Sequence, residues 1–416
     1  MLMLGLNSRT AQAESPKELS LTDCLNLARS QSLQTLQSSF NVKFVEASRH
    51  EIESARRPSL SGVGAFEKSD DVNTQLPDAN KAVLRLEQTA LPFTSSWIRA
   101  NQKQFELRAA EFAHLESELD VSLLVKQLYF SILRDQDAIL RLNEVEVQLK
   151  ALLNSLIPRY SIGRTLPFDI IKIKSSLSDL VRTQELTEAQ LDVEKTQLAQ
   201  LIRLSSHDGS YDKVSFKTIS NLPKLAFEDA NPKSVEANPS IHALTEQLHA
   251  AEIGVTVAKA NRYPSFIGAF EYGYTGQSAN DMNRGWSLTF GLKLPLFDWG
   301  MISSQIAQES TNTQISRVKY EIAKEKAALD LNEALGLAKA HLADRNRLQA
   351  LIPETKKASL ISIDRYKRGA VGILEASEAT NLWIQTLLGE RSSFYNFLTD
   401  LAKIDRLRGT SEYESL

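Results

Sequence analysis

The sequence contains very little cysteine and no cluster of residues that could hold a metal ion. Cys24 is the single cysteine among 416 residues, so the chain cannot form an intrachain disulfide. The six histidines are scattered, and neither they nor Cys24 show the spacing of a structural zinc site. A glycine motif that cradles phosphate is also missing. These absences predict a protein with no cofactor, no metal site and no catalytic residues, and therefore not an enzyme.

An excess of charge of one sign is missing as well. Lys and Arg total 48 against 51 Asp and Glu, which gives a formal net charge of -3. A chain with this balance has no general attraction for a polyanion. We therefore expect no nucleic acid among its partners.

Long apolar runs are the third absence. Because a transmembrane helix needs about 20 consecutive apolar residues, no helix of this chain is expected to cross a bilayer, and any crossing must use strands. Residues 1–13 begin with a short apolar stretch and end in Ala11-Gln12-Ala13. This pattern predicts the remnant of a secretory signal peptide, with a frayed N-terminus as the alternative.

The sequence does contain an internal repeat. Pro58-Ser59-Leu60 returns as Pro264-Ser265-Phe266, at an offset of 264 - 58 = 206. Arg159-Tyr160 followed by Gly163 returns as Arg365-Tyr366 followed by Gly369, at the same offset of 365 - 159 = 206. Chance matches would not keep a common spacing, so these anchors predict a duplication.

The duplication divides the chain into parts. Each half is interpreted as a helix, a β-hairpin, a very long helix, a tight turn and a return helix. The expected parts are a signal-peptide remnant at 1–13, a first repeat at 14–204, a linker or equatorial segment at 205–237, a second repeat at 238–408 and a C-terminal tail at 409–416.

The helices are expected to be unusually long. Ser20 and Asp23 form a capping-box pattern, which predicts the start of a helix of roughly 35 residues that ends at Ala55. From about Ser96 to Ser161 only one proline, near the end, interrupts a stretch without glycine. At 1.5 Å per residue this stretch predicts a helix of roughly 100 Å.

The apolar residues of this long helix have the spacing of a coiled coil, in steps of three and four. After a turn at Gly163, the return helix continues the pattern, so the two helices should pack antiparallel. The second half repeats this design, with a long helix from Gly300 to Arg368 and a return helix from Ile373 to about Leu407. The predicted apolar stripe of the first long helix consists of Val125, Leu128, Ile132, Ile139, Leu142, Leu149, Leu153 and Leu156.

The segments before the long helices alternate between apolar and polar residues, as half-buried or lipid-facing strands do. In the clearest one, Trp286, Leu288, Phe290 and Leu292 alternate with small or polar residues, and about 9 to 11 such residues suffice to span a membrane as a strand. Four strands cannot close a barrel in lipid, because their edges would leave backbone groups unpaired. Three copies would supply twelve strands. A half-buried sheet in a soluble protein is the alternative for any one strand.

This order of motifs resembles the TolC-like outer-membrane efflux protein family, from about Leu19 to Leu407. The resemblance implies a mainly α fold with a β-barrel part. Long antiparallel coiled-coil helices would form a trimeric α-barrel, and four strands per protomer would contribute to a shared 12-stranded transmembrane β-barrel. The motifs that carry it are Leu19-Ser20-Leu21-Thr22, Asn238-Pro239, Pro58-Ser59-Leu60, Pro264-Ser265-Phe266, Leu294-Pro295-Leu296-Phe297 and the two Arg-Tyr-x-x-Gly turns.

The resemblance also implies a function and a set of partners. The chain would be a passive channel of a tripartite efflux or type I secretion system, exporting small molecules or proteins. It would sit in the outer membrane of a Gram-negative bacterium and extend into the periplasm. Its partners would be two sister copies in a homotrimer, outer-membrane lipid, a periplasmic adaptor (membrane fusion) protein and an inner-membrane pump of the RND or ABC type.

The family's gate implies candidate site residues close to the two turns. Tyr366 and Asp169 match a hydrogen bond between neighbouring helices in similar proteins. Glu375 and Glu378 stand where relatives carry paired aspartates, and their spacing of three puts them on one helix face. In a trimer they would form rings of carboxylates at a constriction, a natural cation site. Solvated carboxylates near a helix start are the alternative.

The turns themselves are the expected docking surface for the adaptor. The residues concerned are Arg159, Tyr160, Gly163, Arg365 and Gly369. The main alternative function is a soluble coiled-coil scaffold or adaptor, which would use the same helices without entering lipid and would stay in solution after cell lysis.

Overall fold

The structure is a computed structural model that describes residues 18–67, 79–88, 95–203, 215–216, 232–276 and 281–410. The expected signal-peptide remnant at 1–13 lies outside the described residues. Most of the expected segment 205–237 and residues 411–416 of the expected tail lie outside them too.

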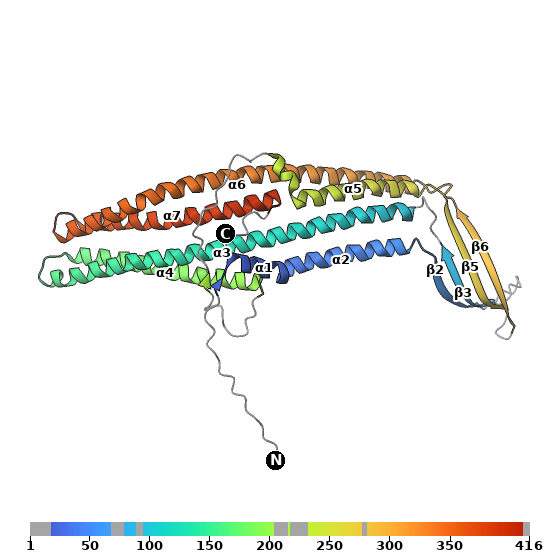
Figure 1. The fold of residues 1–416 in the computed structure, drawn as a ribbon, viewed down its shortest axis with the longest axis horizontal. Coiled ribbons are helices and arrows are strands. Elements are labelled where there is room, and N and C mark those ends of the chain that lie inside the picture. The colour runs from blue at the N-terminus through green and yellow to red at the C-terminus, as the bar shows by residue number, and fades with distance from the viewer. Residues whose placement is uncertain are drawn as a thin grey trace, which may run out of the picture. The chain divides into compact units, whose positions relative to one another are not determined.

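The chain is mostly helical, as predicted, and its described strands are few (Figure 1). Within the described residues, no helix is long and apolar enough to span a membrane. The helices are α1 (Leu21–Gln31), α2 (Leu33–Ser54), α3 (Ser95–Ser161), α4 (Pro167–Leu201), η3 (Pro232–Ala237), α5 (Pro239–Ala260), α6 (Met301–Lys367) and α7 (Ile373–Arg408). The strands are β1 (Glu18–Leu19), β2 (Ser59–Glu67), β3 (Ala79–Gln88), β4 (Ser215–Phe216), β5 (Ser265–Gly276) and β6 (Met282–Lys293).

The chain forms two compact units. Unit 1 contains the described residues of Met1–Leu36, Ser117–Val235 and Ala327–Leu416, and unit 2 those of Gln37–Glu116 and Glu236–Lys326. Unit 1 therefore holds both helix turns, and unit 2 holds the four-stranded sheet.

The first helix begins as predicted but does not run on as predicted. Ser20 and Asp23 form a complete capping box, in which Asp23 N donates to Ser20 Oγ and Ser20 N donates to Asp23 Oδ2, both at 3.1 Å. The expected single helix to Ala55 is interrupted at Ser32, whose ψ is 134°. There the Ser32 hydroxyl accepts a hydrogen bond from the backbone N of Gln34 at 3.3 Å. A serine side chain that bonds nearby backbone competes with the helical pattern, which explains a break that apolar periodicity could not predict.

The core of unit 1 lies between antiparallel helices. In Figure 1, α4 runs back along α3 and α7 runs back along α6. Most of the predicted stripe is buried in this core, but Val145 and Leu152, which the prediction left out, are buried too. Because α3 packs against more than one neighbour, its buried face is wider than a two-helix seam. The stripe residues that are buried are Val125, Ile132, Leu142, Leu149 and Leu156.

The sheet of unit 2 is antiparallel, in the order β2-β3-β5-β6. Side chains on one of its faces are large, apolar and exposed, with Phe66 at 83%, Phe290 at 81% and Trp286 at 70% exposure. Soluble proteins rarely expose apolar patches of this size to water, and such patches usually mark an interaction surface. The exposed apolar residues of this face are Leu60, Phe66, Leu84, Leu86, Phe266, Phe270, Tyr272, Tyr274, Trp286, Leu288, Phe290 and Leu292.

The segment between β6 and α6 holds a strained residue. Trp299 has a φ of 54°, a conformation that is unfavourable for a bulky side chain, and it is 91% exposed. The Asp298 carboxylate fixes this backbone by accepting hydrogen bonds from Gly300 N at 3.0 Å and Ile302 N at 2.8 Å.

We expect the strain at Trp299 to be measurable by comparing two substitutions that both remove the ring. Trp299→Gly should unfold with a free energy about 1 kcal/mol higher than Trp299→Ala, because only glycine adopts positive φ without strain. Denaturant unfolding of the purified protein measures the difference. Equal stability of the two variants would show that the left-handed backbone is absent in solution.

Candidate functional site at the helix turns

The two turns of unit 1 have the same backbone geometry. Gly163 has a φ of 70° and Gly369 a φ of 76°. At the first turn, Gly163 N donates to Tyr160 O at 3.0 Å and Arg164 N donates to Arg159 O at 2.8 Å. At the second turn, Gly369 N donates to Tyr366 O and Ala370 N donates to Arg365 O, both at 2.9 Å. This pair of hydrogen bonds satisfies the last carbonyls of a helix and requires a left-handed residue, which explains the glycine at each turn.

The helices that follow the turns begin with acidic residues. α4 starts at Pro167 and carries Asp169 in its first turn, and α7 follows Gly372 and carries Glu375 in its first turn. Carboxylates are favoured there because the free backbone N–H groups give a helix start a partial positive charge. Glu378, one turn further on, is exposed like Glu375.

A hydrogen bond connects the second turn with the start of α4. Tyr366 Oη, at the end of α6, donates to Asp169 Oδ2 at 2.7 Å. Tyr366 is partly buried against a core cluster that takes Leu156 from α3, Ile173 from α4 and Ile373 from α7. Burial and the Asp169 carboxylate raise the pKa of Tyr366 well above its usual range, so the phenol keeps its proton and remains the donor. The structure thus brings together two of the predicted gate residues.

A second hydrogen bond joins the helical hairpin α3–α4 to the helical hairpin α6–α7, and the sequence did not predict it. Arg159 Nη1, in the last turn of α3, donates to the backbone carbonyl of Lys367 at 2.6 Å. A basic side chain near the carbonyls that end a helix is favourable, so this arginine caps the neighbouring helix in addition to lying at its own turn. The sequence signal was the arginine itself, but nothing in the sequence indicated which helix it would reach.

The predicted acidic pair, Glu375 and Glu378, is exposed, whereas Tyr366 is partly buried. Arg365 Nη1 lies 3.7 Å from Glu375 Oε1, with the two side chains 53% and 54% exposed. An exposed pair of this kind contributes little to stability. Tyr160 is also exposed, at 48%. The structure therefore places Glu375, Glu378 and Tyr160 at the surface of unit 1, where a neighbouring molecule could reach them.

Small polar residues line the packed interface behind the turns. Ser176 and Ser377 are hydrogen-bonded across α4 and α7 at 3.3 Å, and Ser359 and Thr380 across α6 and α7 at 2.9 Å. Ser359, Ser377 and Thr380 are buried. Sequence periodicity did not identify them, because it follows apolar residues only. At these positions the helices are joined by hydrogen bonds between small polar side chains rather than by the packing of large apolar ones.

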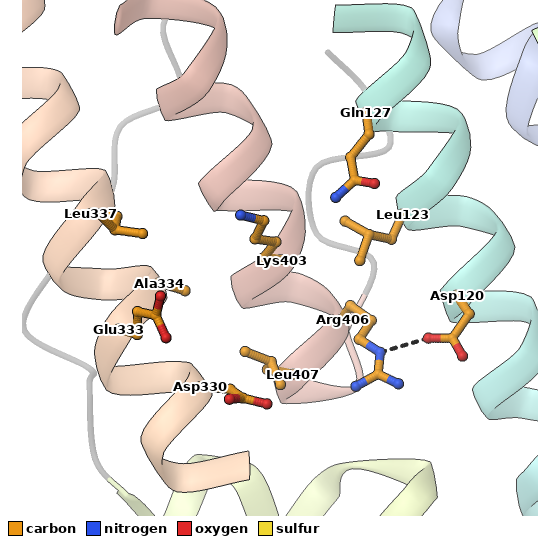
Figure 2. A pocket seen from close by; sticks show the side chains of 10 residues that line it. All are labelled: Asp120, Leu123, Gln127, Asp330, Glu333, Ala334, Leu337, Lys403, Arg406 and Leu407. Atoms are coloured by element: carbon orange, nitrogen blue, oxygen red, sulfur yellow. Dashed lines mark hydrogen bonds and ion pairs between the residues drawn. The ribbon is translucent and has the colours of Figure 1, made fainter. Parts of the chain in front are cut away.

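Unit 1 also has a cavity of about 350 Å³ between α3, α6 and α7 (Figure 2). Its charged residues include Arg406 and Asp120, whose Nε and Oδ1 atoms lie 2.7 Å apart, and Asp330 and Glu333 from α6. Among the described residues, no group of three or more His, Cys, Asp or Glu side chains is placed to hold a metal ion. The cavity offers charge pairing but no recognisable ligand set.

The second half of the chain matches a family model. Residues 232–410 fit the model described as "Outer membrane efflux protein". This match confirms the predicted family resemblance for residues 232–410. The matched model describes an efflux protein rather than an enzyme, in agreement with the absence of predicted catalytic residues. No curated protein sequence matches the chain.

Solved structures of outer-membrane channels share the fold over nearly the whole chain. The Campylobacter jejuni CmeC outer membrane channel has a TM-score of 0.85 at 17% identity, covering 95% of this chain and 87% of that chain. The Vibrio cholerae outer membrane protein VceC has a TM-score of 0.85 at 15% identity, covering 94% and 96%. The open state of the Neisseria gonorrhoeae MtrE outer membrane channel has a TM-score of 0.77 at 15% identity, covering 97% and 94%. The predicted combination of long helices with a four-stranded sheet is therefore the efflux-channel fold.

Proposed function

We propose that three copies of this chain form the outer-membrane channel of a tripartite efflux or type I secretion system. The observation that carries the proposal is the sheet of unit 2, whose exposed apolar face suits contact with lipid. In water the same face would leave Trp286, Phe290 and Phe66 largely exposed. This cost argues against the alternative of a soluble coiled-coil scaffold or adaptor.

The edges of the sheet support a trimer. Within the described residues, β2 and β6 each pair with one strand only. Unpaired backbone groups in lipid cost several kcal/mol each, so a membrane sheet must close on itself. Sister copies that add β2 of one chain to β6 of the next would close it. Three copies of four strands give twelve, an even number within the range of bacterial barrels.

We further propose that the turns of unit 1 form the periplasmic gate. Tyr366 and Asp169 would hold the closed state through their hydrogen bond, and Glu375 and Glu378 would form carboxylate rings in the trimer. The exposed turn residues would bind the periplasmic adaptor, which would connect the channel to an inner-membrane pump of the RND or ABC type. The turn residues concerned are Arg159, Tyr160, Gly163, Arg365 and Gly369.

Fractionation and conductance test the proposed function together. The protein should be found in the outer-membrane fraction of the producing Gram-negative cell, migrate as a trimer after mild extraction, and conduct ions in planar bilayers. A soluble monomer without conductance would contradict the proposal and favour the scaffold function.

Divalent cations should block the channel through Glu375 and Glu378. Replacing both by alanine removes two carboxylates per copy from the proposed constriction, so block should weaken by about tenfold or more. Concentration dependence of block in planar bilayers measures the change. Glu354→Ala, at an exposed glutamate on α6 rather than on α7, is the control. Unchanged block in the double variant would contradict the proposed carboxylate rings of Glu375 and Glu378.

A further inference from the structure

The polar face of the sheet carries a compact group of charged side chains. Lys81 Nζ on β3 donates a hydrogen bond to Glu271 Oε2 on β5. Arg85 Nε, also on β3, lies 3.7 Å from Glu271 Oε1 and 3.0 Å from Glu87 Oε2. Ser287 Oγ on β6 donates to the same Glu271 carboxylate at 3.3 Å. Glu271 thus stands between two cations and is only 16% exposed.

Strand register fixes this group on one face. Arg85 lies directly opposite Glu271, which in turn lies opposite Ser287. Neighbouring residues of a strand point to opposite faces, so Leu288 and Tyr272 belong to the other, apolar face. The charged group is therefore separated from the apolar face by the thickness of the sheet.

On β5, a glycine lies between the row of Lys81 and the row of Glu271. Between the rows of Lys81 and Glu271 lies a row with Val83, Gly273 and Gly285 as cross-strand partners. A Cβ at Gly273 would come within 2.3 Å of the Ala82 carbonyl oxygen, so the backbone there leaves no room for a side chain. No β5 side chain stands between the Lys81 ammonium and the Glu271 carboxylate.

The charges of the group cancel. Lys81 and Arg85 contribute two positive charges, and Glu87 and Glu271 contribute two negative charges, so the sum is 2 - 2 = 0. Rings of like charge in a pore select ions of the opposite sign. A wall that carried the two cations alone would favour anions, and the two carboxylates remove this preference.

We propose that the cluster Lys81, Arg85, Glu87 and Glu271 sets the ion selectivity of the pore within the membrane-spanning strands, with Glu271 as the residue on which its charge balance depends. The inference rests on the proposed function, because the polar face lines the pore only if the apolar face meets lipid. It concerns the strands of unit 2 and is independent of the turns in unit 1.

Reversal potentials of reconstituted channels across a KCl gradient test the inference. Glu271→Gln leaves a net charge of +1 per copy and should shift the permeability ratio of K⁺ to Cl⁻ toward Cl⁻ by about threefold at low salt. Lys81→Gln should shift the ratio the opposite way. The double variant Lys81→Gln/Glu271→Gln is neutral again and should return to the wild-type ratio. Low salt is used because the screening length is about 30 Å at 0.01 M.

A matched control comes from the opposite face. Arg284 on β6 lies over the Tyr272 ring, with its guanidinium 5.0 Å from the ring centre, on the apolar side of the sheet. Arg284→Gln removes the same charge as Lys81→Gln and should leave selectivity unchanged. Equal shifts in both variants, or channels with wild-type selectivity in every variant, would overturn the inference while the proposed function stands. Absence of any wild-type channel would overturn both.

Discussion

Leu288→Arg is expected to prevent the protein from assembling in the outer membrane. Leu288 lies near the middle of β6 on the exposed apolar face, with 54% of its surface accessible. An arginine on the lipid face of a barrel costs about 2–4 kcal/mol at the bilayer midplane, and a trimer carries this cost three times. The measurement is the amount of trimer in the outer-membrane fraction, by comparison with wild type.

The adjacent residue provides the control for this prediction. Thr289 pairs with Ala269 and lies on the opposite face of β6. Thr289→Arg adds the same side chain one residue away, on the face that we assign to the pore, so the variant should assemble normally. Similar loss of trimer in both variants would mean that β6 does not separate lipid from pore.

Tyr366→Phe is expected to open the channel in the absence of an adaptor. The substitution removes only the hydroxyl that donates to Asp169 at 2.7 Å. A hydrogen bond to a charged group contributes about 1.5–3 kcal/mol, so its loss should raise the ratio of open to closed channels by about tenfold or more. Open probability in planar bilayers measures the effect.

Tyr160 is the matched tyrosine for this experiment. It occupies the corresponding place at the first turn, is 48% exposed, and no hydrogen bond of its hydroxyl is found among the described residues. Tyr160→Phe should therefore leave the open probability unchanged. An unchanged open probability in Tyr366→Phe as well would show that this hydrogen bond does not hold the gate.

The same hydrogen bond should resist mild alkali. The pKa of Tyr366 is raised by burial and by the Asp169 carboxylate. A group whose pKa is raised in the folded state stabilises that state below its ordinary pKa and loses the effect as pH rises through the higher value. The ordinary tyrosine pKa is about 10, so gating should not change between about pH 7 and pH 9. A marked rise in open probability over this interval would contradict the assignment of Tyr366 as the proton donor.

The long elements could be predicted from the sequence because their signals are local. A stretch without glycine and with only one proline, Pro158 near its end, predicted a helix from Ser96 to Ser161, and the repeat of this design in the second half predicted another from Gly300 to Arg368; the structure has Ser95–Ser161 and Met301–Lys367. Alternation predicted a strand from Trp286 for the same reason, and β6 runs from Met282 to Lys293. The break at Ser32 escaped prediction because a serine inside an amphipathic stretch gives no sign of whether it will bond its own backbone.

Contacts between distant segments could not be predicted in this way. The bond of Arg159 to the Lys367 carbonyl joins residues that belong to different hairpins, and the Lys81–Glu271 contact depends on the register between β3 and β5. Register is set by packing and by turns along the whole sheet, and a shift by one residue would move Lys81 to the apolar face. The Tyr366–Asp169 pair was foreseen only through the family resemblance.

The edges of the sheet give the most direct test of the trimer. In a chain with Cys24 replaced by alanine, one cysteine in β2, at Val63, is combined with single cysteines along β6, and the protein is oxidised in intact outer membranes. Burial raises the pKa of the natural Cys24 thiol to about 12, so this thiol stays protonated and unreactive at neutral pH. Its replacement therefore removes no reactive group from the protein. We predict covalent dimers and trimers for at least one position in β6. Monomers at every position, in membranes that contain the folded protein, would contradict the account.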